Sequence, residues 1–138
     1  MTSGELARVR SLILKYGWNS TCYQILNPGI AHWISEDGDA VVGYVERGRV
    51  RVVAGAPVCA PERLEEIADA FELAAATKGA SVCYFGAEAR LELLRRRSSS
   101  HSRVLLGAQP VWNPRSWPGI LEGPVSYTHL TLPTIYSV

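Results

Sequence analysis

The sequence contains no long hydrophobic run and almost no net charge. The apolar run nearest the N-terminus, Leu12–Leu14, is far shorter than the roughly 20 residues that a membrane-spanning helix needs. The first residues also lack the basic-then-apolar order of a secretory signal. The 14 Lys and Arg residues nearly balance the 13 Asp and Glu residues, giving a formal net charge of +1. Overall charge therefore favours neither a nucleic acid nor an anionic membrane, and any polyanion site has to be a local patch.

Residues that usually carry chemistry are scarce. The three cysteines are an odd number, lie far apart and form no C-x-x-C pair, which predicts three buried, reduced thiols in a cytoplasmic protein rather than disulfides or a zinc site. The histidines show no metal-ligand spacing, and we expect neither a metal nor another cofactor. Paired carboxylates, a Ser-His-Asp arrangement and a P-loop are also missing, so the sequence names no catalytic residue. The residues concerned are Cys22, Cys59, Cys83, His32, His101 and His129.

The patterns that are present predict alternating elements. The segment Thr2–Glu5 has the spacing of a capping box and opens a helix that ends at Gly17. Residues 18–29 are expected to form an irregular or short helical crossing. From residue 30 the hydrophobic period changes to two, and turns at Asp37-Gly38 and Arg47-Gly48 separate the segments. This order predicts an antiparallel three-stranded meander over Ala31–Ser35, Ala40–Glu46 and Arg49–Ala54.

The second half of the chain continues with helices and strands in turn. A helix is expected between Pro61 and Gly79, a buried strand over Ser81–Phe85, a helix over Ala87–Arg97 and a strand over Arg103–Ala108. In the third meander strand, Val50, Val52 and Ala54 share one face, and Arg49, Arg51 and Val53 share the other. We expect one of these faces to lie in the core and the other to be partly solvated. The fold class is therefore α+β, with a mostly antiparallel sheet flanked by helices.

The corner after the third strand is the first candidate site. A strand that feeds a helix N-terminus can direct backbone N–H groups at an acyl or phosphate oxygen, which makes Gly55 and Pro57 candidate substrate-binding residues. Proline lacks an N–H donor, however, so a purely structural turn is the favoured alternative and a coenzyme A site is not expected. Tyr44, in the middle of a strand, is a third candidate for substrate binding, and its default interpretation is a core tyrosine. Cys59 is the nearest thiol to the helix start, but a small buried residue explains it better.

A run of arginines is the second candidate site. Arg95, Arg96 and Arg97 end the last predicted helix, and Arg90, Arg103 and Arg115 could extend the patch. Guanidinium groups suit bidentate contacts to phosphates, so this patch is a candidate contact for a tRNA acceptor stem. The alternative is that basic residues in a last helical turn only complement the helix dipole.

Four short motifs carry a resemblance to a known family, and they are Tyr16-Gly17-Trp18, Val42-Gly43-Tyr44, Gly55-Ala56-Pro57 and Leu106-Gly107-Ala108. In their order and spacing the chain resembles the C-terminal catalytic region of bacterial phosphatidylglycerol lysyltransferases, which consists of two acetyltransferase-like halves. Roughly residues 10–120 correspond to the first half. The resemblance implies a GNAT-like fold that is incomplete at the C-terminus. The family usually has Gly-Asp-Pro at the third motif, so the acidic side chain is missing here.

The resemblance also implies a function and partners. The intact protein would transfer an aminoacyl group from aminoacyl-tRNA to a lipid headgroup or a small amine or hydroxyl acceptor, without a metal or redox cofactor. A second half-domain would be its intramolecular partner, and the intact protein could associate with a membrane. The chain alone is expected to be inactive. Alternatives are a non-catalytic module that binds RNA or a protein, and a coenzyme A-dependent N-acetyltransferase.

The last residues break with the composition of the rest. After Glu122 no charged residue follows, and the segment PVSYTHLTLPTIYSV resembles translated sequencing-adapter DNA. We therefore expect residues 1–123 to form the truncated half-domain, and residues 124–138 to be a disordered, non-native tail.

Overall fold

The computed structural model describes residues 2–95, 100–107 and 115. The chain divides into two units, residues 1–98 and residues 99–138. In the second unit, the described residues 100–107 and 115 contain no helix or strand. The first unit contains, in order, α1 (Ser3–Tyr16), the 3-10 helix η1 (Ser20–Leu26), β1 (Ala31–Ile34), β2 (Val41–Arg47), β3 (Val50–Ala54), the 3-10 helix η2 (Pro61–Arg63), α2 (Leu64–Thr77), β4 (Ser81–Phe85) and α3 (Glu88–Arg95).

One four-stranded sheet organises the first unit. The strands lie in the order β1-β2-β3-β4, with antiparallel pairing from β1 to β3 and parallel pairing between β3 and β4. A parallel pair needs a crossover connection, and α2 supplies it. The predicted α+β class, with a mostly antiparallel sheet flanked by helices, is confirmed.

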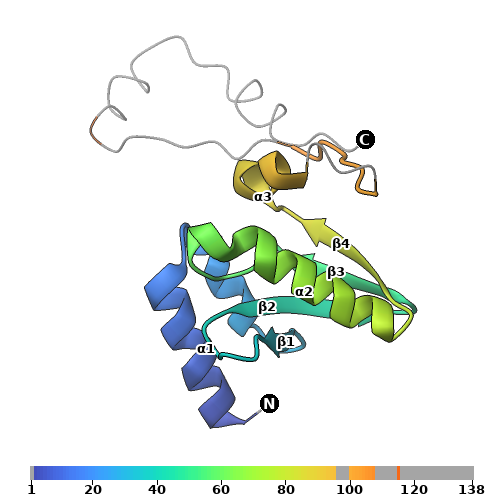
Figure 1. Cartoon of the computed structure of the whole chain (residues 1–138). Helices are drawn as coiled ribbons and strands as arrows, with labels where there is room; N and C mark the ends of the chain where they lie inside the picture. The colour runs from blue at the N-terminus through green and yellow to red at the C-terminus, as the bar shows by residue number, and fades with distance from the viewer. Residues whose placement is uncertain (1, 96–99, 108–114, 116–138) are drawn as a thin grey trace. The chain divides into compact units, whose positions relative to one another are not determined.

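Both faces of the sheet are covered at its centre. Neighbouring residues of β2 point to opposite faces, so Val41 and Val42 belong to two different hydrophobic clusters. Val42 packs on the α2 side, together with Val53 and Phe71. Val41 packs on the other side against α1 and η1. Figure 1 shows α2 lying along one face of the strands.

The faces of β3 agree with the expected alternation, but the arginine face is the more buried one. Arg51 is only 5 % exposed, whereas Val50 at the start of the strand is 40 % exposed. The Arg51 guanidinium lies 4.9 Å from the centre of the Tyr44 ring, and its Nε donates a 3.0 Å hydrogen bond to Glu46. Aromatic faces and a carboxylate thus offset the cost of burying this charge.

Most predicted elements are confirmed to within a few residues, including the short helical crossing that is now η1. The predicted strand over Ser81–Phe85 is confirmed, but its predicted burial is wrong, because β4 lies at the edge of the sheet and only Val82 and Tyr84 are partly buried. The predicted strand over Arg103–Ala108 is wrong for the described residues 103–107, which form no strand. Val104, Leu105 and Leu106 remain exposed there. Strand propensity depends on a neighbouring strand to pack against, and the local sequence cannot supply one. Arg96, Arg97, the predicted boundary at residue 123 and the tail 124–138 lie outside the described residues.

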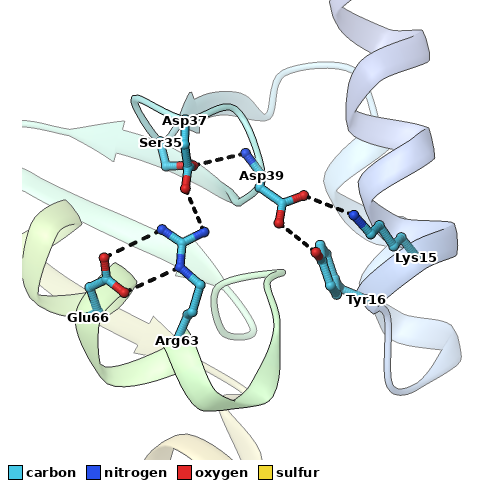
Figure 2. A network of polar contacts seen from close by, with 7 residues as sticks. All are labelled: Lys15, Tyr16, Ser35, Asp37, Asp39, Arg63 and Glu66. Atoms are coloured by element: carbon cyan, nitrogen blue, oxygen red, sulfur yellow. Dashed lines mark hydrogen bonds and ion pairs between the residues drawn. The ribbon is translucent and has the colours of Figure 1, made fainter.

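A polar network joins α1, the β1–β2 turn and the start of α2 (Figure 2). The Asp39 carboxylate accepts hydrogen bonds from the Tyr16 hydroxyl (2.6 Å) and from Lys15 Nζ (3.3 Å). The Asp37 carboxylate accepts one from Ser35 Oγ (2.6 Å) and pairs with Arg63 Nη1 (2.8 Å). The turn is thereby fixed to the helices on both faces of the sheet.

This network predicts an acid-sensitive fold. The Tyr16 hydroxyl, more than Lys15, lowers the pKa of Asp39, and the Ser35 hydroxyl is the largest cause that lowers the pKa of Asp37. A carboxyl whose pKa is lowered in the folded state stabilises the fold above its unfolded pKa of about 4, and this contribution is lost as the pH falls through the folded value. We expect Asp39→Asn to lose less stability than the wild type when urea midpoints are measured from about pH 6 to about pH 3. Equal losses would contradict this role.

Close packing of η1 on β2 gives a second prediction. A Cβ atom at Gly43 would lie 2.5 Å from Cβ of the buried Ile25 and still closer to its Cγ2. Gly43→Ala is therefore expected to lower the free energy of unfolding by about 1–3 kcal/mol in a denaturant titration. The matched control is Gly4→Ala in α1, where an added Cβ meets no atom within 4 Å. That change should raise stability by up to about 1 kcal/mol, since alanine has the higher helix propensity.

Candidate functional site

The carboxyl ends of β3 and β4 form the best candidate site. Ala54 and Phe85 pair at the ends of these parallel strands, and the Gly55 N–H donates a 2.8 Å hydrogen bond to the Phe85 carbonyl. Each strand is followed by a glycine with positive φ, Gly55 at 86° and Gly86 at 71°, and a Cβ on either would meet no atom within 4 Å. Bare backbone beside open space allows close approach of a ligand, and the carboxyl ends of parallel strands are where α/β sheets usually bind ligands.

Glu88, at the start of α3, is held in an unusual conformation beside this edge. Its φ of 62° is the only positive φ of a non-glycine residue in the described part of the chain. Its two carboxylate oxygens accept hydrogen bonds from Trp18 Nε1 (3.2 Å) and Asn19 Nδ2 (2.6 Å). A left-handed non-glycine residue costs about 1–3 kcal/mol and tends to mark a functional or tightly determined position. Here the carboxylate links α3 to the segment between α1 and η1.

Trp18 also supports an arginine. The Arg90 guanidinium lies 4.4 Å from the centre of the Trp18 ring, a cation–π distance. Trp18 itself is partly buried and packs against both hydrophobic clusters, which fixes the plane of its ring. The site therefore combines an open backbone edge with a guanidinium on a rigid aromatic support.

The corner that contains two of the predicted binding residues is mostly internal. Gly55 is half-buried at the open edge, but the Pro57 side chain is fully buried. Val58 exchanges two backbone hydrogen bonds with Val41, of 3.0 and 2.8 Å. The corner is thus a structural strand-to-helix turn in which only Gly55 borders open space. Substrate binding by Gly55 and Pro57 stays a prediction.

Tyr44 lies in the core on the α2 side of the sheet. Its half-buried ring is 5.3 Å from the ring of Phe71 and stacks with the Arg51 guanidinium. It pairs across the sheet with Val53, two residues before Gly55. Its predicted role in substrate binding is also untested.

Arg95 joins α3 to α2. Its guanidinium pairs with Asp69 (2.9 Å) and Glu72 (2.7 Å), and its side chain is 13 % exposed. Glu72 also accepts a 2.7 Å hydrogen bond from the Tyr84 hydroxyl, while burial, followed by that hydrogen bond, raises the pKa of Tyr84 far above its usual value. Contact of Arg95 with a phosphate would have to break two ion pairs. Nucleic-acid binding by Arg95, Arg96 and Arg97 remains a prediction.

The cysteine near the site is unsuited to nucleophilic chemistry. Burial raises the pKa of the Cys59 thiol to about 11, against the smaller opposing effect of Arg63 and Arg90. The thiol is therefore protonated at neutral pH, in agreement with the interpretation as a small buried residue. Within residues 2–95, 100–107 and 115, no three His, Cys, Asp or Glu side chains are grouped so that they could hold a metal ion. None of the helices in these ranges is both long and apolar enough to cross a membrane.

Only some of the residues that meet at this edge carry a signal in the sequence. Trp18 belongs to the motif Tyr16-Gly17-Trp18. The sequence indicates Arg90 only as an extension of the arginine patch. Asn19 and Glu88 carry no local signal, because their hydrogen bond joins residues 69 positions apart.

Comparisons with known proteins agree with this fold. Residues 10–117 match the family model described as phosphatidylglycerol lysyltransferase, C-terminal. L-PGS from Bacillus licheniformis has a similar structure, with a TM-score of 0.51 and 22% identity over 57% of this chain and 25% of that chain. The C-terminal domain of a protein described as a lysylphosphatidylglycerol synthetase from Agrobacterium fabrum has a TM-score of 0.52 and 21% identity over 60% of this chain and 26% of that chain. No match was found among the curated proteins.

The thiol environments predict a simple reactivity order. The prediction of three buried thiols is wrong for Cys83, which is exposed on the edge strand β4, whereas Cys22 and Cys59 are buried as expected. In the folded chain we expect one cysteine to react rapidly with a thiol reagent at about pH 8, and all three to react after denaturation. Cys83→Ser should remove the rapid phase, and Cys59→Ala should leave it unchanged. A rapid phase that disappears in Cys59→Ala would instead identify Cys59 as an activated thiol.

Proposed function

Because the chain belongs to the phosphatidylglycerol lysyltransferase C-terminal family, we propose that it supplies the first acetyltransferase-like half of an aminoacyltransferase. The donor is aminoacyl-tRNA, and the acceptor is the hydroxyl or amine of a lipid headgroup or small molecule. The family match over residues 10–117 carries this proposal, and the acetyltransferase-like sheet supports it.

The reaction needs positioning more than it needs a protein nucleophile. The acceptor oxygen or nitrogen attacks the aminoacyl ester carbonyl, the bond to the ribose oxygen of the tRNA breaks, and the acceptor proton passes to that leaving oxygen. Alignment of the two substrates and hydrogen bonds to the developing oxyanion supply most of the rate enhancement in such a step. The protonated Cys59 thiol takes no part. The open edge at Gly55 and Gly86 suits the positioning of a substrate group.

Two features support a requirement for further protein. The chain spans only about a quarter of the length of the two solved relatives. In addition, α1 and η1 do not cover strand β4 on their face of the sheet. Cys83 is exposed there, and Phe85 is 61 % exposed. Large exposed apolar side chains on a sheet face usually mark an interface. We propose that the second half-domain covers them and that the chain alone is inactive.

The alternatives have less support. A coenzyme A-dependent acetyltransferase would need backbone N–H donors at the corner, where Pro57 and Pro61 provide none. For the RNA-binding alternative, Arg95 is already paired with two carboxylates.

A transfer assay tests the proposal. The chain and the longer protein that contains it would each be incubated with a panel of radiolabelled aminoacyl-tRNAs and phosphatidylglycerol vesicles, followed by extraction of the lipid. We expect the longer protein to form aminoacylated lipid with at least one donor, and the chain alone to form none. Transfer by the chain alone would overturn its proposed inactivity. Failure of the longer protein with every donor, on lipid and on soluble amine acceptors, would overturn the transferase function.

A further inference from the structure

We propose that Arg90, supported on Trp18, binds the phosphodiester of a substrate headgroup at the open edge of β3 and β4. For the identity of its ligand this inference rests on the proposed function. The family description names phosphatidylglycerol, whose headgroup carries one phosphodiester.

The first argument is that Arg90 has unused hydrogen-bond donors. No described residue accepts a hydrogen bond from its guanidinium, which lies over the face of the Trp18 ring. A guanidinium has five N–H donors in one plane, and stacking on an aromatic face leaves the edge of that plane available. Two of these donors match the spacing of two oxygens of a phosphate.

The second argument is that the support is rigid. Trp18 packs against both hydrophobic clusters, and its Nε1 donates to the Glu88 carboxylate. The Glu88 backbone is left-handed (φ 62°), and the Glu88 carboxylate also accepts a hydrogen bond from Asn19 Nδ2. Each carboxylate oxygen of Glu88 thus accepts one N–H hydrogen bond, from Trp18 and from Asn19. An arginine that is oriented before binding loses less side-chain entropy when the ligand arrives.

The third argument comes from the surrounding charges. Charges of both signs act on the Cys59 thiol, those of Arg63 and Arg90 and, in the opposite direction, those of Glu62 and Glu66. Arg63 is neutralised, since it pairs with Asp37 (2.8 Å) and Glu66 (3.3 Å). One free guanidinium matches the single negative charge of a phosphodiester, whereas an RNA backbone needs several cations in a row. These charges favour a small headgroup over a nucleic acid.

The last argument is that space is available. The glycines at the ends of β3 and β4, Gly55 and Gly86, have no atom within 4 Å of the position of a Cβ. Gly86 precedes Arg90 by four residues in the chain, and a polar headgroup can approach this glycine without displacing a side chain.

Binding measurements on the full 138-residue chain test the inference. The probe is glycerophosphoglycerol, the water-soluble headgroup of phosphatidylglycerol, in calorimetric titrations, with inorganic phosphate as a second probe. We expect glycerophosphoglycerol to bind the wild type and to bind Arg90→Gln at least about tenfold more weakly, because charge-assisted hydrogen bonds are lost. Arg90→Lys should also weaken binding, since lysine keeps the charge but loses the planar fork. In NMR spectra, the Arg90 Nε–H signal should shift on addition of the probe.

Arg47→Gln is the matched control. It removes one positive charge from an exposed arginine at the β2–β3 turn, at the amino end of β3, and should leave binding unchanged. Circular dichroism would verify that each variant is folded, and Arg90→Lys serves as the test if Arg90→Gln is not. Equal binding by the wild type and the Arg90 variants, or no binding of glycerophosphoglycerol by the wild type, would overturn the inference.

The other outcomes decide the source of the phosphate and separate the two proposals. Inorganic phosphate binding as tightly as glycerophosphoglycerol would overturn the headgroup assignment. A salt-dependent affinity for oligoribonucleotides that exceeds the affinity for glycerophosphoglycerol would do the same in favour of a nucleic acid. Binding that depends on Arg90 would support the subsite even if the longer protein transfers no aminoacyl group. Transfer by the longer protein, with binding unaffected by Arg90→Gln, would support the function and refute the subsite.

Discussion

The hydrogen bond between Trp18 Nε1 and the Glu88 carboxylate connects the parts of this fold that the sheet alone does not hold together. Trp18 follows α1 directly and packs against the clusters on both faces of the sheet, while Glu88 begins α3. One indole thus joins the α1–η1 layer to the last described helix. Glu88, which also accepts a hydrogen bond from Asn19, has a positive φ that glutamate rarely adopts. The Trp18–Glu88 hydrogen bond lies beside the candidate site, because Glu88 begins the helix that follows the carboxyl end of β4.

Burial distinguishes the arginines of the chain more clearly than their positions in the sequence do. Arg51 and Arg95 are inside or nearly inside the structure, where aromatic rings or carboxylates compensate their charges. A buried ion pair seldom adds much net stability, but removing one partner is costly, so such residues fix the packing of the elements they join. Arg90 differs because an aromatic face orients it while its donors remain unused. That combination is the physical basis for assigning it to a ligand.

The two faces of the sheet are covered to different extents. On the α2 side, the helix covers β2, β3 and β4, and even Tyr84 in the last strand finds a partner in Glu72. On the other side, α1 and η1 cover the centre of the sheet, but Phe85 of β4 remains mostly exposed. Burial of a phenylalanine side chain is worth about 1.5–3 kcal/mol, so covering Phe85 would be favourable.

The sequence by itself determined the elements and the family. Hydrophobic periodicity, the capping-box spacing at Thr2 and glycine turns such as Gly38 and Gly48 depend on neighbours within a few residues, so they predicted the helices, the meander and the α+β class. The order of four motifs identified the family. Only the tertiary structure decided that Arg51 is buried, that residues 103–107 form no strand and that Trp18, Glu88 and Arg90 meet at one edge. These outcomes depend on contacts between residues distant in sequence, and the free energy of such contacts overrides local propensity.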